Sequence, residues 1–241
     1  MPLVNAGDEL AALVVERLHA ARMELQDGDV LVFAQKIVSK SEGRQVDLAT
    51  VVPSGRAQEI AQIARKDPRL VEVILGESRR VVRCTANVLI VEHRLGFVMA
   101  NAGVDQSNVA GDGEFALTLP DDPDASASRL RADIGNRTGR DVAVVISDSF
   151  GRPWRIGTAG VAIGCAGLPA LLDLRGDPDL FRRRLRYTIV GHADEIAAAA
   201  SLVMGQADEG QPVVLVRGLV RDRDPEPAAA LIRPADEDLF R

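Results

Sequence analysis

Two polar segments each place an acid directly after an apolar run of strand length. Asp105 follows residues 97–100, and Asp148, with Ser149 beside it, follows residues 142–146. Oxygen-bearing side chains at the end of a buried strand can hold a hard divalent cation or the phosphates of a nucleotide. We therefore expect two loops after strands, and the chemistry depends on whether their acids meet over one metal ion. The simpler interpretation is that Asp and Ser favour turns after strands.

A second group of residues is suited to binding an anion. Arg152 and Arg155 flank Trp154, the one tryptophan of the chain, and Gly151 precedes them. Guanidinium groups bind carboxylates and phosphates in a forked geometry. The two arginines are candidate substrate-binding residues, whereas Trp154 alone is more simply explained as a packing residue.

The common nucleotide-binding and hydrolase motifs are absent from the sequence. No lysine follows a glycine, which excludes the phosphate-binding loop that ends in Gly-Lys, and no G-x-G-x-x-G opens a helix after a strand. There is no G-x-S-x-G nucleophile motif either. A nucleotide site in this chain must therefore be of a less common kind.

Composition narrows the class of protein. With 241 residues, 46% of them hydrophobic, the chain can bury a real core, and a net charge of −6 argues against a nucleic-acid binder. Cys84 and Cys165 are far apart and form no C-x-x-C pair, so we expect free thiols in a reduced compartment. The three histidines have no metal-ligand spacing, which favours magnesium or manganese held by oxygen over zinc. No signal peptide or membrane-spanning stretch is evident, so a cytoplasmic protein is expected.

The elements that position these residues mix helices and strands. Residues 30–34, 142–146 and 213–216 are apolar runs typical of buried strands, and residues 193–204 form an Ala-rich helix. Because the two kinds of element do not alternate strictly, an α+β fold is favoured over a doubly wound sheet. We expect one domain over residues 1–220 and a weakly packed, acidic tail over residues 221–241.

Four blocks of the sequence are informative together. They are GDVLVFAQKIVSKSEGR at residues 28–44, NAGVDQSN at 101–108, DSFGR at 148–152 with the residues that follow to 157, and ADEIA at 193–197 with MGQAD at 204–208. In this combination the chain resembles a known family, the γ-glutamyl ligases that elongate coenzyme F420. The blocks occur in the family's order and span nearly the whole chain.

The resemblance implies a ligase that uses GTP to join L-glutamate to the lactyl carboxylate of the deazaflavin F420-0, through an acyl phosphate, in coenzyme F420 biosynthesis. It implies Mn²⁺ or Mg²⁺ and a stimulating monovalent cation such as K⁺. It also implies a cytoplasmic homodimer of two-lobed α+β subunits of mixed sheets, with the metal and nucleotide site in the cleft. Neither nucleic acid nor a membrane is an expected partner.

The resemblance also implies roles for individual residues, and Asp105, Asp148 and Lys40 would be the catalytic ones. The expected metal ligands are Asp105, Asp148, Ser149 and Gln206. The expected GTP contacts are Pro2, Leu3, Val4, Ser39, Lys40, Asn108, Met204, Gly205, Gln206, Ala207, Asp208, Glu209, Gly210 and Gln211. Gln206 departs from the acidic ligand of some relatives, but an amide oxygen can still coordinate.

Three other functions remain open on the sequence. A relative with the same fold could glutamylate another acid, such as a folate. A metal-dependent phosphohydrolase could use Asp148 as its nucleophile, although such enzymes commonly carry a second acid two residues later and position 150 is Phe. A non-catalytic nucleotide-binding protein would bind GTP without turnover.

Overall fold

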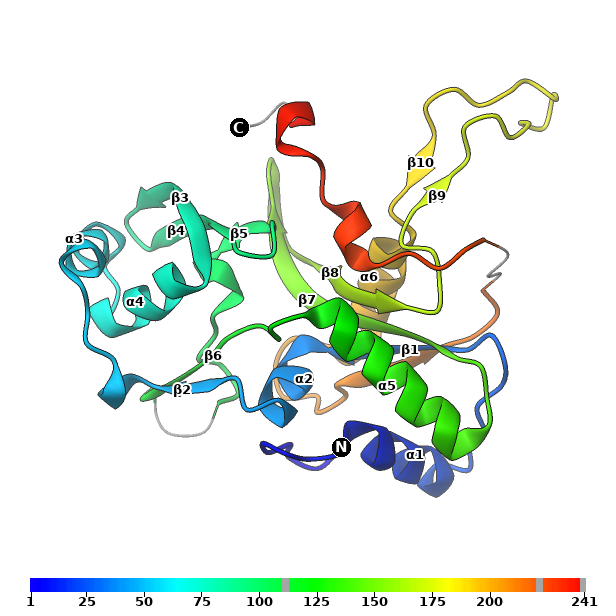
Figure 1. Cartoon of the computed structure of the whole chain (residues 1–241), viewed down its shortest axis with the longest axis horizontal. Helices are drawn as coiled ribbons and strands as arrows, with labels where there is room; N and C mark the ends of the chain where they lie inside the picture. The colour runs from blue at the N-terminus through cyan, green and yellow to red at the C-terminus, as the bar shows by residue number, and fades with distance from the viewer. Residues whose placement is uncertain (110–112, 220–222, 239–241) are drawn as a thin grey trace.

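The computed structural model describes residues 1–109, 113–219 and 223–238 and combines helices with several sheets (Figure 1). The largest sheet has four strands in the order β11-β1-β7-β8. Its strands are β1 Val30–Ala34, β7 Ala143–Arg152, β8 Arg155–Ala166 and β11 Val213–Val216. β1 runs parallel to β7, while β11 and β8 are antiparallel to their neighbours, so the sheet is mixed. The predicted α+β class is confirmed.

Helices cover both faces of this main sheet. Successive side chains of a strand point to opposite faces, and Leu31 and Phe33 pack with α1 (Leu10–Ala20) and α5 (Pro123–Thr138). Val30 and Val32 face α6 (His192–Met204) on the other side. Within the described ranges, no helix is long and apolar enough to cross a membrane.

The second acid-bearing segment differs from our expectation. We predicted a loop after Ile146, but β7 continues through Asp148 to Arg152 and pairs with β8 in a long hairpin. The backbone of residues 147–152 pairs with β8, and the polar side chains of this segment gave no sign of that partner. The hairpin turns at residues 153–154, where Trp154 has a positive φ of 59°. Asp148 therefore lies within a strand of the main sheet and not in a loop.

A second group of elements packs around its own apolar cluster (Figure 1). It contains α3 Gly55–Ala64, α4 Pro68–Gly76 and the sheet formed by β3 Ser78–Thr85, β4 Val88–His93 and β5 Val98–Ala100. The strands β2 (Gln45–Asp47) and β6 (Phe115–Leu117) pair beside it. Ser54 caps α3, since its hydroxyl accepts a hydrogen bond from the backbone N–H of Ala57 at 3.2 Å.

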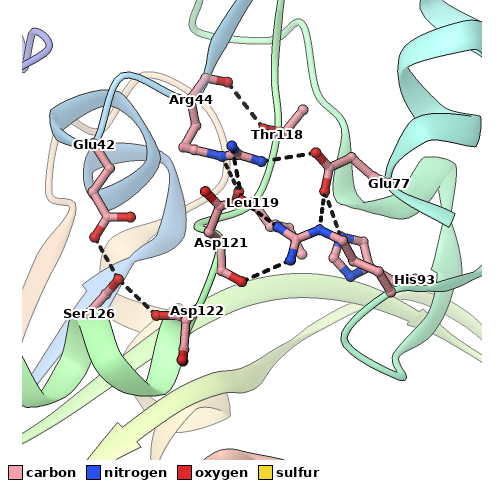
Figure 2. Close-up of polar contacts among 10 residues, drawn as sticks. Glu42, Arg44, Glu77, His93, Thr118, Leu119, Asp121, Asp122 and Ser126 are labelled. Atoms are coloured by element: carbon pink, nitrogen blue, oxygen red, sulfur yellow. Dashed lines mark hydrogen bonds and ion pairs between the residues drawn. The ribbon is translucent and has the colours of Figure 1, made fainter.

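An ion cluster joins this second group to the segments that flank α2 and α5 (Figure 2). Arg44 contacts Glu77 at 2.9 Å and Asp121 at 3.0 Å, and Arg94 contacts the same two acids at 2.8 and 2.7 Å. Burial opposes the charge of Glu77, but hydrogen bonds from His93 and Arg94, with the charges of Arg94 and Arg44, lower its pKa to about 2. We call Arg44, Glu77, Arg94 and Asp121 the ion cluster.

The remaining elements form an arm and the C-terminal segment. In the arm, β9 (Leu172–Asp173) pairs with β10 (Ile189–Val190). The tail was expected to pack weakly. Its described part includes Ala228, which is fully buried against the α6 face and donates its backbone N–H to Asp124 at 2.7 Å. Residues 221–222 and 239–241 of the tail lie outside the described ranges.

The short elements are α2 Gln35–Ser41 and four 3-10 turns, η1 Leu48–Thr50, η2 Asn101–Gly103, η3 Ala228–Leu231 and η4 Ala235–Glu237. The helix α2 begins directly after β1, in the segment that the sequence showed only as polar. The helix α2 lines the cavity described below, and η2 leads into the segment that contains Asp105 and Asn108.

Candidate functional site

A cavity of about 700 Å³ opens beside the end of β1 and residues 147–149 of β7. Its wall is made by α2, the first residues of the chain, the loop that follows α6 and part of the hairpin. Many of the predicted site residues line it: Pro2, Leu3, Val4, Lys40, Asn108, Asp148, Ser149, Met204, Gly205, Gln206, Ala207, Asp208, Glu209, Gly210 and Gln211. Five separate segments of the chain therefore meet in one place, as a nucleotide site would require.

Two lysines reach from α2 toward the segment that holds Asp105. Lys36 and Lys40 lie one helical turn apart and so on the same side of the helix. The Lys40 ammonium donates to the backbone carbonyl of Asn108 at 2.6 Å. The Lys36 ammonium contacts the Asp105 carboxylate at 2.7 Å and donates to the Ser107 hydroxyl at 2.6 Å. Burial, aided by the charge of Lys36, lowers the pKa of Lys40.

A left-handed turn leads into Asp105. Asn101, Ala102 and Gly103 have φ values of 54°, 54° and 67°. A side-chain-bearing residue in this conformation costs about 1–2 kcal/mol, so the fold tolerates strain here. Backbone hydrogen bonds of 3.0 and 2.8 Å with Leu117 then fix Asp105 beside β6. The turn thus determines where the carboxylate lies.

The Asp105 carboxylate is held in its charged form. It accepts hydrogen bonds from the backbone N–H of Ser107 at 2.7 Å and from the Ser107 hydroxyl at 3.0 Å. Burial opposes ionisation, but the bonds from Lys36 and Ser107 outweigh it and lower the pKa of Asp105. An ionised carboxylate at neutral pH is what a metal ligand requires.

Asp148 has the opposite electrostatic environment. Burial raises the pKa of its carboxyl to about 6, although a hydrogen bond from the Ser149 N–H and the charge of Lys36 oppose the rise and the charge of Asp105 adds to it. That hydrogen bond measures 2.8 Å. The charges of Lys36 and Asp105 therefore both influence the ionisation of Asp148. A cation between the two acids would offset the cost of burying the Asp148 carboxylate.

The loop after α6 is held to the Asp105 segment and to itself. The Asn108 side-chain amide donates to the carbonyl of Ala207 at 3.2 Å, and the Glu209 carboxylate accepts from the Ala207 N–H at 2.8 Å. Gly205 has a φ of 72°, and a Cβ there would overlap the Glu209 carboxylate. Glycine is therefore required at the start of the loop. Asp208 and Glu209 are exposed.

Four predicted residues do not line the cavity. Ser39 is fully buried, and its hydroxyl donates to the Gln35 side chain at 2.8 Å. Asp105 does not line the cavity itself, but its carboxylate contacts Lys36, which does. Arg152 and Arg155 pair at the far end of the hairpin, and one guanidinium nitrogen of Arg152 is buried without a partner among the described residues.

Sequence reasoning missed several residues of the wall, among them Gln35 and Lys36. Gln35 and Lys36 line the cavity, and Lys36 makes the contact that joins its charges. The signal was the spacing of Lys36 and Lys40, which places both on one side of a helix. It was overlooked because the segment was not recognised as helical.

The donors present fit a hard divalent cation. Among the described residues, no three His, Cys, Asp or Glu side chains gather as a metal-binding group. The predicted ligands Asp105, Asp148, Ser149 and Gln206 offer carboxylate, hydroxyl and amide oxygens only. Such a set suits Mg²⁺ or Mn²⁺, which commonly complete their shells with water and substrate phosphates.

Comparisons with known proteins identify the family of this chain. A family model described as F420-0:Gamma-glutamyl ligase matches residues 1–218. The coenzyme F420:L-glutamate ligase of Methanothermobacter thermautotrophicus is 49% identical over 246 residues, which cover 100% of this chain and 96% of the relative. The Methanopyrus kandleri protein of the same name is 48% identical over 242 residues, 99% of this chain and 93% of the relative. That of Halobacterium salinarum is 42% identical over 247 residues, 100% of this chain and 92% of the relative.

Proposed function

The chain belongs to the F420-0:gamma-glutamyl ligase family, and we propose that it joins L-glutamate to the lactyl carboxylate of coenzyme F420-0 in a GTP-dependent reaction of coenzyme F420 biosynthesis. The observation that supports this most is the cavity lined by Lys36, Lys40 and Asp148, where Lys36 also contacts the Asp105 carboxylate. A cluster of this kind suits phosphate groups and a divalent cation together.

The chemistry requires activation of a carboxylate. The γ-phosphoryl group of GTP is transferred to the lactyl carboxylate, which breaks the bond between the β- and γ-phosphates and forms an acyl phosphate. The glutamate amine then attacks the acyl carbon, loses its proton and displaces phosphate. Both steps develop negative charge on oxygen, so fixed positive charges aimed at those oxygens accelerate them.

The chain's own residues have separate tasks in this proposal. Asp105, Asp148, Ser149 and Gln206 hold Mn²⁺ or Mg²⁺, which neutralises charge on the phosphates. Lys40 and Lys36 act as point charges on phosphate oxygens. Asn108, residues 2–4 and the loop 204–211 bind the nucleotide. Arg152 and Arg155 bind an anionic group of the deazaflavin tail or of glutamate.

The proposal extends to the assembly. The two groups of elements form two lobes with the site in the cleft between them, K⁺ stimulates the reaction, and the enzyme is a cytoplasmic homodimer. Large apolar side chains on the arm support a dimer, since Leu180 is 99% exposed, Tyr187 87% and Phe181 79%. Apolar surface of this kind is more often covered by a partner than left in water.

Mass spectrometry of the products tests the function. Purified protein is incubated with F420-0, L-glutamate, MnCl₂ and GTP, and a product heavier than F420-0 by one glutamyl residue is expected. Parallel reactions replace GTP with ATP, replace F420-0 with a folate, or omit glutamate. Glutamylation of the folate alone would reject the deazaflavin acceptor. Phosphate release without glutamate, together with a phosphorylated Asp148, would identify a phosphohydrolase instead.

A further inference from the structure

A bulge interrupts the pairing of β7 and β8 beside Asp148. Ile146 pairs with Gly164, but the next residue, Ser147, pairs with Ala162, so β8 contains one extra residue at this point. Bulges increase the local twist and re-aim nearby side chains, and they occur often beside active sites. The direction of the Asp148 side chain, one residue beyond the bulge, therefore depends on how the bulge is held.

The first turn of α6 provides the group that holds it. The Asp194 carboxylate accepts a hydrogen bond from the backbone N–H of Ala162 at 2.9 Å. Ala162 is the residue with which strand pairing resumes after the bulge. Two residues along β8, Gly160 approaches α6 so closely that a Cβ would overlap the Ala197 carbonyl. Gly160 itself pairs with Ser149 and lines the cavity.

We propose that Asp194 is a positioning residue, which fixes the bulge in β8 and so aims the Asp148 carboxylate into the cavity. Asp194 does not line the cavity, so it acts only through the strands. The same helix ends at Met204, where the loop 205–211 begins. The helix α6 thus positions both the Asp148 carboxylate, through Asp194, and the start of the loop 205–211. The link to metal binding rests on the proposed function of Asp148.

The chain contains a matched control on the opposite face of the sheet. The Asp124 carboxylate, in the first turn of α5, accepts from the backbone N–H of Cys165 at 2.8 Å. Cys165 pairs with Val145, on the other side of the bulge from Asp148. Asp124 therefore binds the same strand through one backbone N–H, in addition to the N–H groups of Ala228 and Ala229, but at a point that does not direct the acid.

Three variants test the proposal: Asp194→Ala, Asp194→Asn and Asp124→Ala. Binding of Mn²⁺ to the metal-free full chain, with MnCl₂ as the only addition, is measured by electron paramagnetic resonance. Loss of a group that orients a metal ligand typically weakens metal binding about 10–100-fold, and we expect this of Asp194→Ala. The Asn variant keeps an acceptor oxygen for Ala162 and should bind within about threefold of wild type, because the expected loss requires removal of that acceptor. Asp124→Ala should lose thermal stability but keep its Mn²⁺ affinity.

Hydrogen exchange gives a readout that needs neither metal nor substrate. The amides around Ala162 should exchange faster in Asp194→Ala than in wild type, and those in Asp194→Asn should not. Wild-type Mn²⁺ affinity in a folded Asp194→Ala protein would overturn the proposal, as would an equal loss in Asp124→Ala or no rescue by Asn in a folded variant. A wild-type protein that binds Mn²⁺ but adds no glutamate would reject the proposed function and leave this comparison intact.

Discussion

Removing the charge of Asp148 should stabilise the metal-free protein while it destroys the metal site. Burial raises the pKa of this carboxyl from an ordinary 3.8 to about 6. One pKa unit corresponds to about 1.4 kcal/mol, so the folded, metal-free chain loses about 3 kcal/mol at pH 8 by keeping Asp148 ionised. Asp148→Asn has nearly the same shape and keeps an acceptor for the Ser149 N–H, but it carries no charge. For a chain of this size the gain corresponds to a rise in Tm of roughly 6–12 °C.

The difference in Tm between Asp148→Asn and wild type should depend on pH in one direction. The folded-state pKa of Asp148 lies above its unfolded value, so the folded protein binds more protons between pH 4 and 6 and loses stability as the pH rises. Below about pH 4 the carboxyl is protonated in both states, and the variant and wild type should differ little in Tm. The difference should open between pH 4 and 6 and stay constant above that range.

The assay is thermal unfolding in EDTA from pH 4 to 8, with Asp105→Asn as the matched control. The pKa of Asp105 is lowered by Lys36 and Ser107 against the effect of burial, so its charge stabilises the fold and its removal should lower Tm at pH 8. Adding MnCl₂ should raise the Tm of wild type but not of Asp148→Asn, because only a ligand that binds the folded state stabilises it. A lower Tm for Asp148→Asn at pH 8, or a difference that does not change with pH, would refute the reasoning.

Three further predictions concern other parts of the site and fold. Lys36→Met should slow GTP-dependent glutamate addition about 10²–10³-fold, as loss of one fixed charge typically does. Mass spectrometry follows product formation, and an unchanged rate would contradict this prediction. Gly160→Ala should cost about 1–3 kcal/mol in urea unfolding because its Cβ would overlap the Ala197 carbonyl, whereas Gly151→Ala, with open space around it, is the control that should unfold like wild type. Glu77→Gln should destabilise the protein by up to about 3 kcal/mol at pH 7, and since the wild-type pKa is about 2 the difference should shrink only as the pH falls below about 4.5; an equal difference at pH 7 and 3 would argue against the charge.

Local sequence patterns predicted the elements whose signals are complete within one segment. The apolar run of β1 was predicted at the residues where the strand occurs, Val30–Ala34, and the Ala-rich helix α6 begins one residue before the predicted start. The continuation of β7 past Ile146 was not predicted, because it depends on hydrogen bonds to β8 across a turn. Polar side chains such as Ser147 and Asp148 indicated a loop only while that partner was unknown.

The site residues also divide into those that the local sequence reveals and those that only distant contacts explain. Asp105 and Asp148 were visible as acids after strands, yet only the three-dimensional arrangement joins them through Lys36. The contact between Asn108 and Ala207 connects residues 99 positions apart, and no local pattern contains that information. The family resemblance identified the loop 204–211 because it compares whole blocks, which periodicity cannot do.

The topology explains why part of the site is robust and part depends on distant contacts. β1 and β7 are parallel neighbours, and Ala34, the last residue of β1, pairs with Ser147. Lys36, just beyond β1, and Asp148, within β7, are therefore brought close by strand pairing alone. Asp105 follows β5 and belongs to the second group of elements, which the ion cluster ties to the segments beside α2 and α5. The cluster is thus one of the contacts, together with the Lys36–Asp105 pair, that hold the second group beside the main sheet. Damage to Glu77 should then weaken a cation shared by both acids, although Glu77 does not line the cavity.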